Sequence, residues 1–331
     1  MAAAPVGDDV YQEDPTVAEL EAATAQLLGH EAGLFVPSGT MSNLLGVWLT
    51  AGRGQEVLCD EQAHIVRAEL GSHAGLHGIL TRTWHSGGTG LASAEVIAAM
   101  IAAPAPYLVA TAGVEIENTH NFGGGTVQPF DELVAINKLC RDAGLNLHLD
   151  GARLWNAHVA TGVPMADYGR LFDTVSVCYS KGLGAPVGSV LVGGAEAIDR
   201  ARIQRKALGG GMRQAGILAA ACLYALHHNV ARLADDHASA AALAEQVASQ
   251  APGALVAPPQ TNIVVMGTGT APAAQVVAAA RQAGVLISGV GAHAVRAVTH
   301  LDVTAQQCGE AGARLGQILA LGWSADPQRD F

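Results

Sequence analysis

The chain has 331 residues and a net charge of −11, half of its residues are apolar and only 14% are charged. This composition supplies enough apolar surface for a folded core and excludes a disordered chain, and no run of lysine or arginine is long enough to follow a nucleic acid backbone. Five scattered cysteines form neither a CxxC pair nor a Cys/His ligand spacing, so we expect no disulfide framework, no metal site and a reducing, cytoplasmic location.

The amino terminus gives no targeting signal, because Met1–Asp9 has neither a basic stretch nor a hydrophobic core. One uncharged apolar run, Val96–Val114, approaches the length of a membrane span. Pro104 and Pro106 divide it, so it predicts a short helix, a turn and a strand at Tyr107–Thr111. We expect no membrane segment.

Helical and strand patterns alternate through the first two-thirds of the chain. The expected helices include Thr16–Gly29, Ser38–Ala51 and Phe130–Ala143. The expected strands are Leu34–Val36, Val57–Cys59, Ile79–Thr81, Tyr107–Thr111, Leu145–Leu149, Thr174–Cys178 and Ser189–Val192. This alternation predicts an α/β fold with a mostly parallel sheet between helices.

The last third of the chain predicts a smaller α+β domain. Its expected helices are Arg232–Gln250, Ala273–Ala283 and Thr304–Ala320, after a long helix at Gln214–Val230. Its expected strands are Ala254–Ala257, Asn262–Met266 and Ala294–Val298. We place the boundary near residue 230, giving a large domain over 1–230 and a small domain over 231–331.

Lys181 lies in a glycine-rich turn between the two apolar runs Thr174–Cys178 and Ser189–Val192. A free ammonium between core strands is costly to bury, but the amine is tolerated if it binds an aldehyde cofactor covalently. The alternative is a solvated lysine in a turn.

Asp150 ends the apolar run Leu145–Leu149 and precedes Gly151. A carboxylate at the carboxyl end of an α/β strand points into the ligand crevice. Pyridoxal phosphate requires an acid beside its pyridine nitrogen as well as a lysine for its aldehyde, and Asp150 followed by Lys181 supplies both. The alternative for Asp150 is a helix N-cap.

Taken together, these residues resemble the threonine aldolase family of pyridoxal-phosphate enzymes. The resemblance extends along nearly the whole chain, through Pro5–Thr16, Val36–Asn43, Glu117–Asn121, His148–Arg153, Ser180–Gly184, Gly209–Gln214 and Val298–Asp302. It implies the aspartate-aminotransferase-like fold (fold type I), pyridoxal 5'-phosphate as cofactor, and retro-aldol cleavage of β-hydroxy-α-amino acids.

Four residues are expected to contact the cofactor phosphate. Gly39 and Thr40 lie where a strand turns into a helix, whose backbone N–H groups suit a phosphate, although Ser38 could be an ordinary N-cap. The resemblance implies that Arg213 reaches a phosphate from a neighbouring subunit and that Lys206 assists it. It therefore implies a homo-oligomer with active sites at the subunit interface, expected as a homotetramer built as a dimer of dimers, with a simple dimer as the alternative.

His64 follows the strand Val57–Cys59, and the matching histidine of the family stacks on the cofactor ring. A histidine there can exchange the proton of the substrate's β-hydroxyl group near neutral pH. His148 points to the same side of its strand as Asp150, and a packing role is equally consistent with the pattern.

Arg153 and Arg296 are the residues expected to bind the substrate carboxylate, since arginine offers two parallel N–H donors. That anchor also decides which bond at Cα stands perpendicular to the cofactor ring and breaks. A structural salt bridge is the alternative for each arginine.

The chain departs from the family in two places. A segment of about twenty residues that usually precedes Pro5 in the family has no counterpart here, so impaired activity is one expectation. Tyr107 stands where many members carry a histidine near the β-hydroxyl group, and we expect its own hydroxyl group to contact the substrate.

The resulting hypothesis is an aldolase that cleaves L-threonine or L-allo-threonine to glycine and acetaldehyde, in threonine catabolism and glycine biosynthesis. Lys181, His64 and Asp150 are its expected catalytic residues. The alternatives are another fold-type-I reaction, β-elimination or racemisation, and a subunit that binds the cofactor but is inactive.

Overall fold

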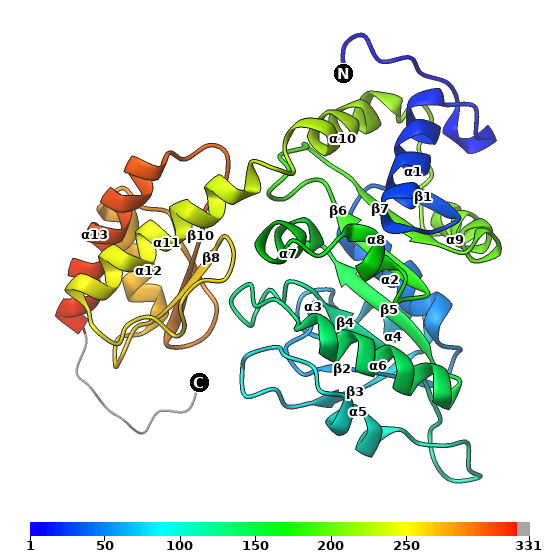
Figure 1. Ribbon diagram of the computed structural model, residues 1–331, viewed down its shortest axis with the longest axis horizontal. Coiled ribbons are helices and arrows are strands. Elements are labelled where there is room, and N and C mark those ends of the chain that lie inside the picture. The colour runs from blue at the N-terminus through cyan, green and yellow to red at the C-terminus, as the bar shows by residue number, and fades with distance from the viewer. Residues whose placement is uncertain (323–331) are drawn as a thin grey trace.

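A seven-stranded sheet forms the centre of the larger part of the molecule in the computed structural model, which describes residues 1–322 (Figure 1). Its strand order is β1-β7-β6-β5-β4-β2-β3, and all neighbouring pairs are parallel except those that β7 makes with β1 and β6. The strands are β1 (Ala32–Val36), β2 (Glu56–Asp60), β3 (Leu80–Trp84), β4 (Thr111–Glu117), β5 (Asn146–Gly151), β6 (Thr174–Cys178) and β7 (Ser189–Gly193). The expected α/β fold with a mostly parallel sheet is confirmed.

Helices cover both faces of this sheet. The alternate residues of β1 show this, because Phe35 packs in one apolar core while Leu34 and Val36 pack in another. The helical segments of this part are η1 (Asp9–Tyr11), α1 (Pro15–Leu28), α2 (Gly39–Thr50), α3 (His64–Arg67), α4 (Ser72–His77), α5 (Ala94–Met100), α6 (Phe130–Ala143), α7 (Leu154–Thr161), α8 (Met165–Gly169), α9 (Ala195–Ala207) and α10 (Gly216–His228). A sheet buried on both faces explains why most of its strands appear in the sequence as continuous apolar runs.

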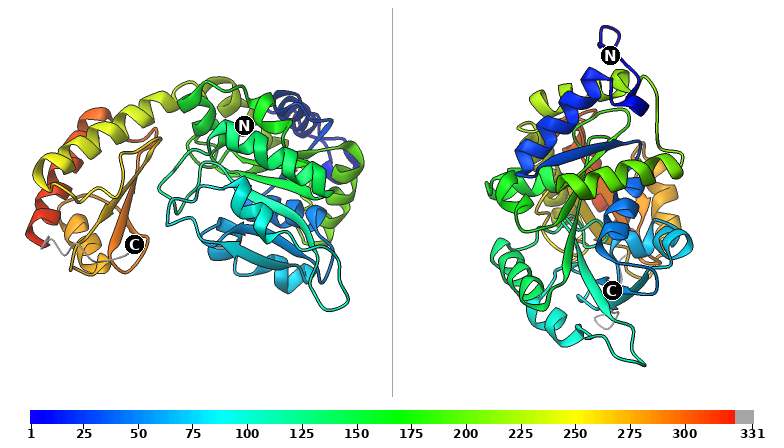
Figure 2. Two further views of the ribbon diagram at one scale, coloured as in Figure 1. Left: turned by 60° about the horizontal axis from the view of Figure 1, so that its bottom comes forward. Right: turned by 90° about the vertical axis from the view of Figure 1, so that its right-hand side faces the viewer.

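The smaller part contains a three-stranded antiparallel sheet in the order β8-β10-β9, which lies beside the large sheet in two views (Figures 1 and 2). Its strands are β8 (Ile263–Gly267), β9 (Ser288–Gly289) and β10 (Ala294–Val298), and its helices are α11 (Leu233–Gln250), α12 (Ala273–Gln282) and α13 (Ala305–Gly322). These elements share an apolar core of their own, to which Leu243, Val264, Val295 and Leu315 belong. We keep the domain boundary near residue 230 as a proposal.

Two predicted strands are wrong. The run Tyr107–Thr111 is mostly a loop, and β4 instead extends over Thr111–Glu117. Buried Glu115 and Glu117 interrupt the apolar pattern of β4, which is why the sequence does not indicate it. The run Ala254–Ala257 forms only an isolated bridge between Leu255 and Met266.

Within residues 1–322 no helix is both long and apolar enough to cross a membrane. The five cysteines are buried and unpaired. The run Val96–Val114, in particular, divides into α5, a loop and the first part of β4.

Candidate active site

The carboxyl ends of the parallel strands β4, β5 and β6 bring the first site residues together. Glu117, Asp150 and Ser176 are aligned across these three neighbouring strands. Lys181 follows three residues after the end of β6. Parallel strands direct their carboxyl ends to one edge of the sheet, so residues far apart in the sequence meet there.

Asp150 is fully buried and is held by donors on both of its oxygens. Asn43 Nδ2 donates to Oδ2 over 2.7 Å, and the backbone N–H of Ala152 donates to Oδ1 over 3.0 Å. Burial by itself would raise the pKa of Asp150, but Lys181, His64 and these hydrogen bonds together hold the pKa below its ordinary value. The carboxylate is therefore anionic although it is inside the protein.

Lys181 lies beside the start of α2. Its Nζ is 3.5 Å from the Sγ of Cys178, which also accepts a hydrogen bond from Ser189 Oγ at 3.1 Å. A Cβ atom added to Gly39 would lie 2.8 Å from that Sγ and 3.9 Å from Lys181 Nζ. Only glycine leaves the backbone of this helix start open toward the lysine amine.

These residues fit pyridoxal phosphate. Its aldehyde needs an amine, which Lys181 offers, and its pyridine nitrogen needs a carboxylate that stays anionic when buried, which Asp150 is. Its phosphate needs backbone N–H groups at a helix start, and α2 begins at Gly39 with Thr40 exposed next to it. Ser38 caps this helix through Met41 N, and this cap leaves the N–H groups of Gly39 and Thr40 without a capping partner.

His64 is the first residue of α3, and its side chain is one-quarter exposed. Its backbone N–H donates to Glu117 Oε2 over 3.0 Å, and its Nδ1 is 2.8 Å from Oε1 of buried Glu69. One side-chain atom each of His64, Glu69 and Asp150 lie within 4.8 Å of one another. The structure therefore places His64 beside Asp150 and adds Glu69 to the pair.

Arg153 and Arg296 converge on one neutral side chain. Oδ1 of Asn121 accepts from Arg153 Nη1 over 3.1 Å and from Arg296 Nη1 over 2.6 Å. Neither arginine forms a salt bridge within the described part of the chain. Burial lowers the pKa of each arginine, and Arg153 lowers that of Arg296 further. The charges of Glu117 and Asp150 act on Arg153, but within the described residues neither carboxylate forms a salt bridge with it, so the two guanidinium groups form a site suited to a substrate carboxylate.

Arg213 follows the glycine turn Gly209–Gly211 and is more than half exposed. Its Nη1 donates to Asp8 Oδ2 over 2.6 Å. A Cβ on Gly210 would lie 2.2 Å from Met41 Sδ, and one on Gly211 would lie 2.9 Å from Lys206 Cδ. The turn therefore packs on the first turn of α2 and on Lys206, and it places Arg213 and Lys206, two of the four predicted phosphate contacts, in one region.

Tyr107 is not brought to the site within one chain. It lies in the loop before the amino end of β4 and is 85% exposed, whereas Glu117 and Asp150 lie at the carboxyl edge of the sheet. A contact with substrate would require a second subunit.

His148 is buried below the site. Its Nδ1 is 2.8 Å from Thr174 Oγ1 and its Nε2 is 3.4 Å from Asn43 Oδ1, while burial lowers its pKa to about 4. It is therefore a neutral hydrogen-bonding residue, which agrees with the packing alternative.

Asn43, Asn121 and Glu69 are among the polar residues at the site that were not assigned roles from the sequence. Asn43 and Asn121 each end a motif of the resemblance, and their amide groups could have been considered as links between charged groups. Glu69 lies outside every motif. It follows His64 by five residues, and because α3 ends between them, this spacing does not indicate that the two side chains meet.

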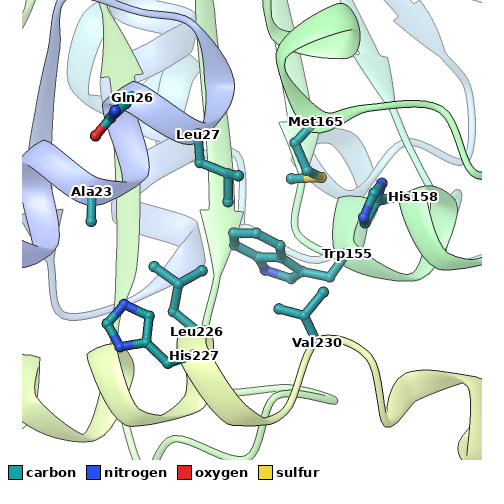
Figure 3. A pocket seen from close by; sticks show the side chains of 9 residues that line it. All are labelled: Ala23, Gln26, Leu27, Trp155, His158, Met165, Leu226, His227 and Val230. Atoms are coloured by element: carbon teal, nitrogen blue, oxygen red, sulfur yellow. The ribbon is translucent and has the colours of Figure 1, made fainter.

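A separate cavity of about 550 Å³ opens between α1, α7, α8 and α10. Figure 3 shows the Trp155 ring in the middle of its wall, with Leu27, Leu226 and Val230 around it. Trp155 Nε1 donates to the carbonyl oxygen of Cys178 over 3.0 Å. None of the predicted site residues lines this cavity.

Comparison with known proteins gives a family model and relatives that agree with one another. The family model described as "Beta-eliminating lyase" matches residues 1–270. The low specificity L-threonine aldolase of Escherichia coli K12 is 41% identical over 320 residues, which cover 97% of this chain and 94% of that protein. A probable low-specificity L-threonine aldolase of Arabidopsis thaliana is 46% identical over 74% of this chain and 70% of its own length.

Among solved structures, a putative L-allo-threonine aldolase from Listeria monocytogenes superposes with a TM-score of 0.80 at 22% identity, covering 96% of this chain and 89% of that chain. The threonine aldolase of Leishmania major gives a TM-score of 0.80 at 23% identity, covering 93% and 91%. At these identities the two structures show the shared fold.

Proposed function

This chain belongs to the threonine aldolase family of the beta-eliminating lyases, and from that premise we infer that it is a pyridoxal-phosphate-dependent lyase. It cleaves L-threonine and L-allo-threonine, and related β-hydroxy-α-amino acids, to glycine and an aldehyde. The observation that carries this conclusion is that Lys181 and buried, anionic Asp150 lie at the same edge of the sheet, where the charge of Lys181 lowers the pKa of Asp150. The convergence of Arg153 and Arg296 on Asn121 supports an amino-acid substrate.

Pyridoxal phosphate, when bound, supplies an electron sink for the pair released when the Cα–Cβ bond breaks. Lys181 would hold its aldehyde carbon, and Asp150 would accept a hydrogen bond from its protonated pyridine nitrogen. Gly39 and Thr40, at the start of α2, would bind its phosphate through their backbone N–H groups.

Arg153 and Arg296 bind and orient the substrate. Their guanidinium groups replace or supplement the contact with Asn121 by hydrogen bonds to the α-carboxylate. Fixing the carboxylate turns the Cα–Cβ bond toward the perpendicular orientation that cleavage requires. The small part of the molecule contributes through Arg296 on β10, so it completes the substrate site.

His64, or a water molecule that it holds, accepts the β-hydroxyl proton as the carbonyl group of the aldehyde forms. Its ring is partly exposed and lies next to Asp150. Glu69 and other carboxylates raise its pKa above the ordinary value, which makes its imidazole a stronger base near neutral pH.

The test is identification of the products. Purified protein loaded with cofactor and given L-threonine should release glycine and acetaldehyde in equal amounts. A 2-oxo acid with ammonia would indicate β-elimination, and appearance of D-allo-threonine, the product of inversion at Cα alone, would indicate racemisation.

We also propose a homo-oligomer, dimeric or a dimer of dimers, in which Arg213 contacts the phosphate at a neighbouring subunit's site. Its exposure and its position beside the glycine turn support this role. Mixing Lys181→Ala with Arg213→Ala subunits should restore part of the activity, because one site of each hybrid dimer would be intact. A protein that sediments as a monomer at assay concentration would contradict the proposal.

The unpaired cysteines support a reducing, cytoplasmic location for this enzyme. The reaction would serve threonine catabolism and glycine formation there.

A further inference from the structure

Glu69 and His64 form a hydrogen-bonded pair that no sequence motif indicates. Glu69 Oε1 is 2.8 Å from His64 Nδ1, and the Glu69 side chain is completely buried while that of His64 is one-quarter exposed. The carboxylate therefore lies on the inner side of the imidazole ring. Within residues 1–322 His64 Nε2 has no hydrogen-bond partner in the protein.

Asn43 fixes the direction of this hydrogen bond. Its Nδ2 donates to Glu69 Oε1 over 2.8 Å and to Asp150 Oδ2 over 2.7 Å. Because an amide nitrogen can only donate, Oε1 of Glu69 acts as an acceptor. The form of His64 that complements this acceptor carries its hydrogen on Nδ1. The NH₂ group of Asn43 thus connects Glu69, the partner of His64, with Asp150, the carboxylate expected to face the cofactor nitrogen.

The backbone after α3 is bent in a way that turns Glu69 inward. Leu70 has a φ of 55°, in the left-handed region, and its side chain is fully exposed. Gly71 follows with a φ of 66° and precedes α4. A leucine in this conformation costs roughly 1–3 kcal/mol, and such strain is concentrated at functional sites. Here the strained turn lies directly after the residue that contacts His64.

We propose that Glu69 is a positioning residue, which holds the His64 ring with its hydrogen on Nδ1 and so leaves Nε2 free to accept the substrate's hydroxyl proton. This inference rests on the proposed function of His64. A base oriented by a buried carboxylate is a general arrangement, in which the carboxylate selects the tautomer and stabilises the protonated ring.

Several charged groups face His64. Glu69 and Asp150 do so from the α3–α4 turn and from β5, and Glu117 does so from β4. The hydrogen bond to Glu69 is the main cause that raises the pKa of His64, and burial opposes it. The pKa of Glu69 itself is raised, because burial and the charge of Asp150 outweigh the lowering effect of its hydrogen bonds with His64 and Asn43. Removing the charge of Glu69 should therefore lower the pKa of His64.

Glu69→Gln tests this role, because glutamine keeps the shape and an acceptor oxygen but loses the charge. Glu115→Gln is the matched control. Glu115 is also completely buried in this acidic region, but its two oxygens have no hydrogen-bond partner within the described chain. Burial raises the pKa of Glu115 well above its ordinary value, so replacing it should change the local charge less than replacing Glu69 does.

The pKa of His64 can be measured without substrate or cofactor. Diethyl pyrocarbonate reacts with the unprotonated imidazole, so the rate of modification of His64, followed by peptide mass spectrometry across pH, gives its midpoint. We expect Glu69→Gln to lower this midpoint by about one pH unit and Glu115→Gln to leave it unchanged. An unchanged midpoint in Glu69→Gln, or an equal shift in both variants, would overturn the proposal.

Kinetics give a second readout. In cofactor-loaded Glu69→Gln, kcat/KM for threonine should fall by at least tenfold while its acidic limb moves to lower pH, since the base is then less basic. Glu69→Asp keeps the charge but withdraws the oxygen from the ring, so kcat should fall, and the midpoint should also fall but by less than in Glu69→Gln. Wild-type kcat in this variant would overturn the proposal. If threonine is not cleaved at all, the modification experiment still decides the role of Glu69 separately from the proposed function.

Discussion

Replacing Arg296 with lysine separates a substrate anchor from a structural contact. In the structure Arg296 Nη1 donates to the neutral amide oxygen of Asn121 over 2.6 Å. Lysine would keep one positive charge but not the pair of parallel donors that a carboxylate accepts. Losing one charge-assisted hydrogen bond costs about 1.5–3 kcal/mol, which corresponds to about one to two decades in kcat/KM. We expect this loss mainly as a higher KM for threonine.

The effect of Arg296→Lys on stability should be small. The protein partner of Arg296 is a neutral amide, so the net loss is about 1 kcal/mol, or a fall in Tm of about 2–4 °C. Steady-state kinetics and thermal unfolding should be measured on the same preparation. Arg281→Lys, at an exposed position of α12, is the control and should match wild type in both. Unchanged kinetics combined with a large fall in Tm would refute the assignment and leave Arg153 as the anchor.

Three further predictions concern the cofactor site and the residues beneath it. Gly39→Ala places a methyl group 2.8 Å from Cys178 Sγ, so it should destabilise the protein by about 1–3 kcal/mol and weaken cofactor binding. Gly75→Ala, whose methyl group would have no atom within 4 Å, is the control and should do neither. Urea unfolding and cofactor titration measure the two effects. Burial lowers the pKa of His148 in the folded protein to about 4, below its ordinary value of 6.5. The free energy of unfolding should therefore fall by about 2 kcal/mol as the pH drops from 7 to 5. Urea unfolding of His148→Gln should lack this pH-dependent loss. Borohydride should fix the cofactor on Lys181 in wild type and on no residue in Lys181→Ala, and a peptide map showing another lysine would contradict the assignment.

Lys181 and Asp150 could be predicted from the sequence because each interrupts or ends an apolar run. A charged residue in such a run is conspicuous, and the strand β5 places Asp150 where the pattern indicated. The same rule fails for β4, because Glu115 and Glu117 are both buried in that strand and their presence hides it. The buried acidic residues of β4 are thus the reason that this strand was misplaced.

The contacts between side chains could not be predicted. Asn43 links Glu69 to Asp150, and these three residues come from α2, the α3–α4 turn and β5. Asn121 links Arg153 to Arg296 in the same way, across the two parts of the molecule. Such pairings depend on how elements distant in sequence pack, whereas sequence patterns report the burial of one element at a time.

Cleavage of threonine in D₂O tests the central claim most directly. Retro-aldol cleavage breaks the Cα–Cβ bond and adds one solvent hydrogen to Cα, while the aldehyde hydrogen of acetaldehyde comes from Cβ. Mass spectrometry should therefore find glycine with one carbon-bound deuterium and acetaldehyde without deuterium at its carbonyl carbon. Deuterated threonine without glycine, or a deuterated 2-oxo acid with ammonia, would contradict the account.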